Sequence, residues 1–245
     1  VAVMTAAVIA KPLAVEVEAL GTARSNEAID ITAKSANTVI SVRFEEGQLV
    51  RRGELLIELD GAQARADLAA AEAALAESKN AYARSRDLFT QQALSQAQLE
   101  QIEATLLANE ARVAAARARL SDTLIRAPFD GRMGLRRVSV GALVNPGAVI
   151  TTLDDTSTMK VDFDVPEVFL AVLKAGLAVV AQSAAYAGES FNGEVESVDS
   201  RVDPVTRTIK VRARLPNPQG RLRSGMFLTV RVRREPLPGL VIPEQ

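Results

Sequence analysis

A duplicated segment interrupted by a long insertion constrains this chain more than any other feature. Residues 33–60 read AKSANTVISVRFEEGQLVRRGELLIELD, and residues 127–154 read APFDGRMGLRRVSVGALVNPGAVITTLD. The two copies align without a gap, beginning with Ala33 against Ala127. Each copy contains only short stretches with β-type alternation and cannot bury an apolar face by itself. We therefore expect the two copies to pair into one flattened β-sandwich.

Glycines stand at the same two places in each copy. Gly47 and Gly53 belong to the first copy, and Gly141 and Gly147 are their equivalents in the second. Glycine adopts positive φ angles without the steric strain that a side chain causes. These four positions therefore predict tight turns between short strands, and we assign them a structural role.

The insertion, residues 61–123, has the composition of a helical hairpin. It contains no proline, its only glycine is Gly61, and it is rich in Ala, Leu, Glu, Gln and Arg, which favour helices. Two arms carry seam residues at heptad spacing: Leu68, Ala71, Leu75, Ser78, Tyr82, Ser85 and Phe89, then Leu99, Ile102, Leu106, Asn109, Val113, Ala116 and Leu120. This pattern predicts two antiparallel helices packed as a coiled coil. Ser95, followed by Gln98, predicts a capping box at the start of the second helix.

The rest of the chain has the pattern of a small β-barrel. Apolar and polar residues alternate after the second copy, and Asp203-Pro204, Pro216-Asn217-Pro218 and Ser224-Gly225 mark turns. Pro166 predicts the start of one short helix. Several short strands with one helix indicate a closed barrel, which leaves no exposed sheet edges.

At this point the chain resembles the periplasmic adaptors, or membrane fusion proteins, of the HlyD-like family. The two copies are similar to the half-motifs of a biotinyl/lipoyl-carrier domain, here split by an α-hairpin. The run from Asp203 to Thr208, with Asn217-Pro218 and Gly225-Met226 after it, is similar to the β-barrel domain of adaptors that serve RND-type multidrug efflux pumps. Arg207, inside that run, is either a solvent-facing strand residue or a contact to the transporter, and we favour the former.

The resemblance covers nearly the whole chain and implies an elongated α+β fold. It implies a split lipoyl-like β-sandwich with an inserted coiled-coil hairpin, and a small β-barrel domain with one short helix. The domains expected are a lipoyl-like sandwich (30–60 and 124–156), a hairpin (61–123), a β-barrel (18–29 and 157–234) and strands of a partial membrane-proximal domain (1–17 and 235–245).

Three residues near the expected tip of the hairpin have the spacing that this family uses to contact a TolC-like outer-membrane channel. They are Arg84, Leu88 four residues later and Ser95 seven residues after that. Arg84 and Leu88 share a helix face through their i, i+4 relation. Each residue also has an ordinary structural interpretation, because Ser95 is a good helix N-cap, Leu88 is apolar filler and Arg84 is a solvated charge.

The function implied by the resemblance is that of a non-enzymatic periplasmic adaptor in a tripartite efflux pump. Its partners would be an inner-membrane RND transporter, a TolC-like channel and further copies of itself in a trimeric or hexameric ring. No cofactor, metal or nucleic acid is expected. The apolar opening of the chain is too short to cross a bilayer, so we expect the attachment to the inner membrane to lie outside this sequence.

Composition narrows the alternatives. The chain has no His, no Cys, no Trp and a net charge of −1, which disfavours common metal sites, His- or Cys-based catalysis and nucleic-acid binding. An ABC-exporter adaptor remains open, and a metal-efflux adaptor is disfavoured. A lipoyl or biotin carrier is disfavoured because the only lysine of the insertion, Lys79, lies inside a helical pattern. An enzyme with paired carboxylates, Glu45 with Glu46 or Asp154 with Asp155, is disfavoured because strand neighbours point to opposite faces.

Overall fold

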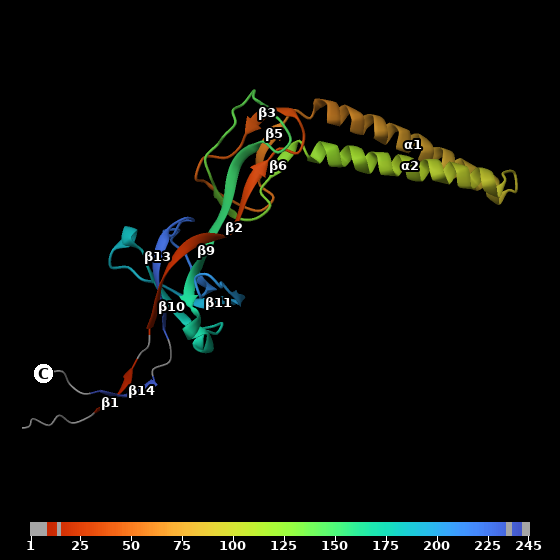
Figure 1. Ribbon diagram of the computed structural model, residues 1–245. Helices are drawn as coiled ribbons and strands as arrows, with labels where there is room; N and C mark the ends of the chain where they lie inside the picture. Colours follow the sequence, from red (N-terminus) through yellow and green to blue (C-terminus); the bar gives the residue numbers. More distant parts are fainter. Residues whose placement is uncertain (1–8, 14–15, 234–236, 242–245) are drawn as a thin grey trace, which may run out of the picture. The chain divides into compact units, whose positions relative to one another are not determined.

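The computed structural model describes residues 9–13, 16–233 and 237–241 of the 245-residue chain (Figure 1). The chain divides into two units. The sandwich unit spans Ile29–Leu153, and the barrel unit combines the residues up to Ala28 with those from Asp154 onward. Two long strands, β2 (Glu16–Thr32) and β9 (Val149–Pro166), run across the unit boundaries.

The membrane-proximal strands predicted at residues 1–17 and 235–245 lie largely outside the described residues. The part that is described consists of β1 (Ile9–Leu13) and β14 (Leu237–Val241), which pair antiparallel with Ile9 opposite Val241. Two strands from opposite parts of the sequence therefore form one two-stranded ribbon.

The sandwich unit is built from strands that pair between the two copies of the repeat. Its short strands are β3 (Asn37–Val42), β4 (Leu49–Val50), β5 (Leu55–Leu59), β6 (Leu124–Arg126), β7 (Gly131–Met133) and β8 (Leu143–Val144). One antiparallel sheet has the order β6-β5-β3-β8, and β4 pairs with β7. Thus β3 of the first copy pairs with β8 of the second, and the equivalent strands, β7 and β4, pair in return.

The turn glycines take part in the same exchange. Gly147 donates its backbone N–H to the carbonyl oxygen of Ala33 at 2.9 Å, and the equivalent Gly53 donates to Ala127 at 2.7 Å. Gly141 donates to Val39, and Gly47 donates to Met133. Reciprocal contacts of this kind define a local two-fold axis between the copies.

All four turn glycines have positive φ. The angles are 78° for Gly47, 84° for Gly53, 84° for Gly141 and 83° for Gly147. A Cβ atom at any of them would meet no other atom within 4 Å. Backbone conformation, rather than space, is therefore what favours glycine at these turns.

The core of the sandwich unit draws on both copies. Buried residues include Val39, Val50, Leu56, Ile57 and Leu59 from the first copy, and Met133, Val144, Ile150 and Leu153 from the second. Because strands and core are both shared, neither copy has a complete fold alone.

The insertion forms the predicted hairpin of two helices that lie side by side, α1 (Ala62–Thr90) and α2 (Gln96–Ser121) (Figure 1). The predicted seam is confirmed, since all but one of its residues are buried or half-buried, with Ser78, Asn109, Val113 and Ala116 the most enclosed. Ion pairs join the helices beside the seam, with Arg117 2.7 Å from Glu72 and Lys79 3.8 Å from Glu110.

Phe89 is the exception, and its predicted place in the seam is wrong. Its side chain is 38% exposed. Because α2 begins only at Gln96, just the first turn of α2 is available to cover the last turn of α1.

The barrel unit is a closed antiparallel sheet. Its strands are β10 (Ala178–Gln182), β11 (Phe191–Val202), β12 (Thr208–Pro216) and β13 (Phe227–Arg233), together with parts of β2 and β9. The order is β12-β11-β10-β13-β2-β9, and pairing of β9 with β12 closes the barrel. Inward-facing residues such as Met159, Val161, Phe163, Val211, Leu215 and Val230 fill its core.

Two short 3₁₀ helices accompany the barrel. The helix predicted after Pro166 is the 3₁₀ helix η1 (Glu167–Val172), with Pro166 as its N-cap, and η2 (Ala184–Tyr186) was not predicted. The fold class is confirmed, because a sandwich, an inserted helical hairpin and a β-barrel are all present. Among the described residues, no helix is long and apolar enough to cross a membrane.

Candidate docking site at the hairpin tip

The end of α1 is closed by a Schellman motif. The N–H of Gln92 donates to the carbonyl of Phe89 at 3.0 Å, and the N–H of Ala93 donates to the carbonyl of Leu88 at 2.9 Å. Gln92 takes the left-handed conformation, with φ of 57°, that glycine usually supplies at this position. Backbone hydrogen bonds to Phe89 and to Leu88, a residue of the candidate site, therefore hold the turn in place.

The start of α2 is closed by the capping box that the sequence predicts. The hydroxyl of Ser95 accepts a hydrogen bond from the N–H of Gln98 at 3.3 Å, and the Gln98 side chain accepts one from the N–H of Ser95 at 3.2 Å. The interpretation of Ser95 as the helix N-cap is thus confirmed, and its contact with a partner stays a separate prediction.

All three candidate residues are exposed at the tip. Arg84 and Leu88 lie on successive turns of α1, with Leu88 44% exposed, and Ser95 lies across the turn at the start of α2. Arg84 makes no ion pair within the described part of the chain. The tip therefore presents an unpaired guanidinium and an apolar side chain, both available for contacts outside the chain.

The surroundings of these residues are polar, and Arg86 and Asp87 between Arg84 and Leu88 are exposed as well. The turn and the first turn of α2 expose the amide side chains of Gln91, Gln92, Gln96 and Gln98. Phe89, which the heptad pattern assigned to the seam, is a second exposed apolar residue next to Leu88. Phe89 is exposed because α2 begins only at Gln96. The heptad spacing of apolar residues does not indicate where α2 begins.

Three of the four carboxylates considered as catalytic groups, Glu46, Asp154 and Asp155, accept hydrogen bonds from neighbouring residues. Glu46 accepts the N–H of Arg136 at 2.9 Å, and Asp154 accepts the hydroxyl of Ser25 at 3.2 Å. Burial alone would raise the pKa of Asp155, but hydrogen bonds from Ser157 and Asn26 outweigh it and hold the pKa below its ordinary value. A carboxylate held in its ionised form by neighbours is a poor general acid.

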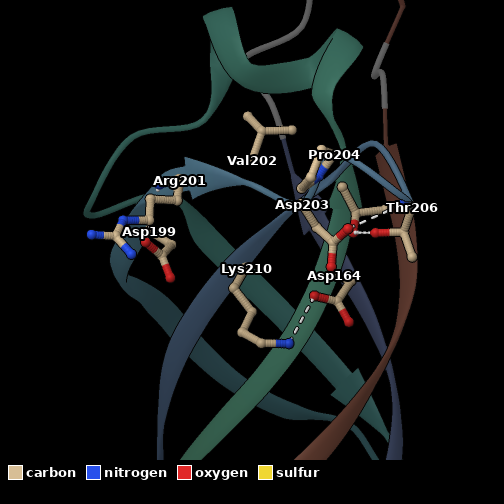
Figure 2. Close-up of a pocket in the computed structure, with 9 residues that line it drawn as sticks. Asp164, Asp199, Arg201, Val202, Asp203, Pro204, Thr206 and Lys210 are labelled. Atoms are coloured by element: carbon tan, nitrogen blue, oxygen red, sulfur yellow. Dashed lines mark hydrogen bonds and ion pairs between the residues drawn. The ribbon is translucent and has the colours of Figure 1, made fainter.

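A groove on the barrel unit, with a volume of about 530 Å³, lies beside the turn from Asp203 to Thr206 (Figure 2). Lys210 pairs with Asp164 at 3.2 Å across it. Asp203 accepts the N–H groups of Val205 and Thr206, and these bonds lower its pKa. Lys210 and Asp164 therefore pair with each other, and the carboxylate of Asp203 stabilises the turn.

Arg207 lies at the end of the same turn rather than on a strand. Its interpretation as a strand residue was therefore wrong. Its φ is 54°, and β12 begins one residue later. The guanidinium is exposed, as expected, and lies 3.9 Å from the carboxylate of Glu167 on η1. The backbone must reverse sharply before β12, which the alternation of residue types did not show.

Comparison with known families agrees with this architecture. Residues 27–153, more than half of the chain, match the family described as "RND MFP, barrel-sandwich hybrid domain". The chain belongs to the RND-type membrane fusion proteins. Residues 159–236 of this membrane fusion protein also match the family described as "CusB-like, beta-barrel domain".

Relatives named for multidrug resistance are similar over most of this membrane fusion protein. The multidrug resistance protein MdtA of Photorhabdus laumondii is 30% identical over 245 residues, covering 91% of this chain and 61% of the relative. MdtA of Escherichia coli K12 is 32% identical over 235 residues, covering 87% and 57%. The chain thus spans less than two thirds of the length of these relatives.

A solved structure supports the same placement. A chimera of MacA with the α-hairpin domain of MexA from Pseudomonas aeruginosa superposes with a TM-score of 0.81 at 26% identity. The match covers 94% of this chain and 86% of the chimera. The hairpin-bearing architecture is therefore shared with this chimera.

Proposed function

We propose that this membrane fusion protein is the periplasmic adaptor of a tripartite efflux pump and docks a TolC-like outer-membrane channel through the tip of its hairpin. Its other partner would be an inner-membrane RND transporter, with the protein attached to the inner membrane in the periplasm. It would assemble in a ring and catalyse no reaction. The observation that carries the proposal is the exposed trio Arg84, Leu88 and Ser95 at the end of a hairpin inserted into an RND-type sandwich domain.

Each tip residue has a distinct chemical part in docking. The guanidinium of Arg84 donates charge-assisted hydrogen bonds to carboxylate or carbonyl oxygens at the ends of the channel's helices. Leu88 fills an apolar groove between those helices and is desolvated on contact. Ser95 is small and holds the start of α2, so the second helix approaches the channel without a bulky side chain.

A cross-linking experiment in living cells tests the proposal, because the chain has no native cysteine. Cysteine is placed at Ala97, an exposed residue two positions after Ser95, and paired with single cysteines at the periplasmic end of the co-expressed channel. The matched control is Ala108→Cys, which lies on the same face of α2 about three turns farther from the tip.

We expect a channel adduct from Ala97→Cys and none from Ala108→Cys. Arg84→Asp or Leu88→Ala, added to Ala97→Cys, should abolish the adduct while the melting temperature is retained, since both side chains are exposed. Equal yields at both cysteines, or an adduct indifferent to Arg84→Asp, would contradict tip docking.

A further inference from the structure

The end of the barrel next to η1 encloses a pocket with a volume of about 230 Å³. Its walls come from β2, from η1, from the segment between η1 and β10, and from β13. The lining residues are Val17, Val168, Phe169, Val172, Leu173, Leu177 and Val232. All seven side chains are apolar, so they offer a ligand neither a hydrogen bond nor a charge.

One wall of the pocket belongs to the buried core of the barrel. Val17 on β2 lies opposite Val232 on β13, and both side chains are buried. Leu173, the residue after η1, is buried in the same core. Strand pairing and core packing hold these three residues, so this wall is present before any ligand binds.

The 3₁₀ helix η1 forms the opposite wall. Positions three residues apart lie on the same side of a 3₁₀ helix, and Phe169 and Val172 are both partly buried. Val168 also lines the pocket but is 78% exposed, which places it at the rim. The helix therefore covers the end of the barrel without filling it, and a ligand enters beside Val168.

Hydrogen bonds hold this cover at both of its ends. At the start of η1, the N–H of Glu167 donates to the carbonyl oxygen of Arg207 at 3.0 Å. After η1, the N–H of Gly176 donates to the carbonyl oxygen of Val195 at 2.8 Å. The pocket is therefore preformed, as binding sites for small molecules usually are.

The size and the lining of the pocket define the class of ligand. A buried water molecule needs about two to four polar partners, and the lining side chains supply none. An apolar protein cavity of about 150 Å³ stays dry and binds benzene. The larger pocket at η1 has room for such a ring with a short apolar substituent, and Phe169 offers it an aromatic contact.

We infer that this pocket is a binding site for small apolar ring compounds of about the size of toluene. The mouth of a β-barrel is a common place for a small-molecule site. The pocket lies within the barrel unit, so the inference goes beyond docking at the hairpin tip and does not depend on it.

A titration of the full chain with toluene tests the site, with NMR following the chemical shifts of labelled valine and leucine methyl groups. We expect saturable shifts for Val17, Leu173 and Val232, and none for Val205, which is 88% exposed and does not line the pocket. Phenol is the matched probe. It should bind about tenfold more weakly, because its hydroxyl leaves water without gaining a side-chain partner.

Decanoate, kept below its micellar concentration, distinguishes a lipid acyl chain from a ring compound. We expect decanoate to bind more weakly than toluene, because a flexible chain loses more rotational freedom in an enclosed pocket.

Two substitutions locate the binding to this pocket. Val172→Phe places a larger side chain in the pocket and should weaken toluene binding by about tenfold or more. Val205→Phe is the matched control and should bind toluene as the parent does. Phe169→Ala enlarges the pocket from the same helix and should admit naphthalene, which the parent excludes. Circular dichroism shows which variants retain the fold.

Several results would overturn the inference. They are the absence of a saturable shift up to the solubility of toluene, and equal affinities of Val172→Phe and Val205→Phe for toluene. Phenol or decanoate binding as tightly as toluene, or naphthalene binding the parent as tightly as Phe169→Ala, would also reject it. The cross-link at Ala97 reports on a different part of the chain, so its result stands whatever the titration gives.

Discussion

The backbone N–H of Gly53 lies 2.7 Å from the carbonyl oxygen of Ala127, although the two residues belong to different copies of the repeat. Their equivalents, Gly147 and Ala33, make the same bond at 2.9 Å. Each turn glycine thus closes a turn in its own copy and attaches that turn to the other copy. Substitutions at the two glycines should therefore have matching effects.

Gly53→Ala and Gly147→Ala should each lower the free energy of unfolding of the sandwich unit by about 1–2 kcal/mol, because an alanine at positive φ is strained. Urea unfolding measured by circular dichroism provides the values. Asn145→Ala, in the same turn as Gly147 but at an ordinary φ, is the control and should change stability by less than about 0.5 kcal/mol. Unequal effects of the two glycine substitutions would argue against the two-fold equivalence of the turns.

Substitutions at Ser95 should separate its capping role from contact with a channel. Ser95→Ala removes the side-chain cap and should destabilise the hairpin by ~1 kcal/mol. Ser95→Asp keeps a side-chain acceptor for the N–H of Gln98, so hairpin stability should be retained while docking weakens through added size and charge. Thermal melting and the Ala97 cross-link together report the two effects. A Ser95→Asp protein that docks as well as the parent would mean that Ser95 is only a cap.

Asn109 in the hairpin seam should lower the stability of the hairpin while it fixes the register in which α1 and α2 pack. Its side chain is buried and donates to the carbonyl of Ala74 at 3.4 Å, a long hydrogen bond for a desolvated amide. Asn109→Leu should raise the melting temperature of the hairpin, since an apolar residue suits a seam position better. Without the amide the helices lose a specific pairing, and a disulfide between cysteines at Glu72 and Arg117 should form in lower yield. An unchanged or lower melting temperature would show that the amide contributes net stability.

The pair of Asp162 and Arg212 should make barrel stability depend on pH. Arg212 donates two hydrogen bonds to the carboxylate, at 2.6 and 2.9 Å, and this lowers the pKa of Asp162 below the ordinary 3.8. Because the folded pKa is the lower one, the stabilisation is complete above pH 4 to 5 and is lost as pH falls through the folded value. At pH 7, Asp162→Asn should cost about 1–3 kcal/mol of unfolding free energy, and the difference from the parent should shrink toward pH 2.

Asp164→Asn is the matched control for that pair. Asp164 lies on the same strand, and its partner Lys210 on β12 is 3.2 Å away, but both side chains are mostly exposed. An exposed pair contributes at most about 1 kcal/mol. A pH dependence as large for Asp164→Asn as for Asp162→Asn would show that net charge, rather than the half-buried pair of Asp162 and Arg212, controls the acid transition.

Features that depend on local pattern were predictable from the sequence. The heptads placed Leu75, Asn109 and Val113 in the seam, and the spacing of Ser95 and Gln98 specified a cap that the structure contains. The exposure of Leu88 and Arg84 agrees with their expected place at the tip, while their contact with a channel stays a prediction.

Features that depend on distant partners were not predictable. Asn217 begins a turn as predicted, since its carbonyl accepts the N–H of Gly220, but its side chain is also buried and its amide bonds Thr156, far away in sequence, and Leu222. Gln92 adopts positive φ because the chain must return along α1, although nothing in glutamine itself favours that conformation. Likewise, Phe89 fits the heptad pattern and is exposed because α2 begins only at Gln96, so just its first turn lies near Phe89.

The insertion separates the two copies of the repeat along the chain, but its two ends lie next to each other and bring the copies close together in space. The N–H of Leu59, just before α1, donates to the carbonyl of Thr123, just after α2, at 2.8 Å. Closing an unstructured loop as long as the insertion would oppose folding by roughly 3–4 kcal/mol of chain entropy. A hairpin held by contacts between sequence neighbours across its turn forms quickly and removes much of that barrier before any strand pairs. The same helices that carry the candidate docking site at one end therefore help, during folding, to bring residues 33–60 and 127–154 close together.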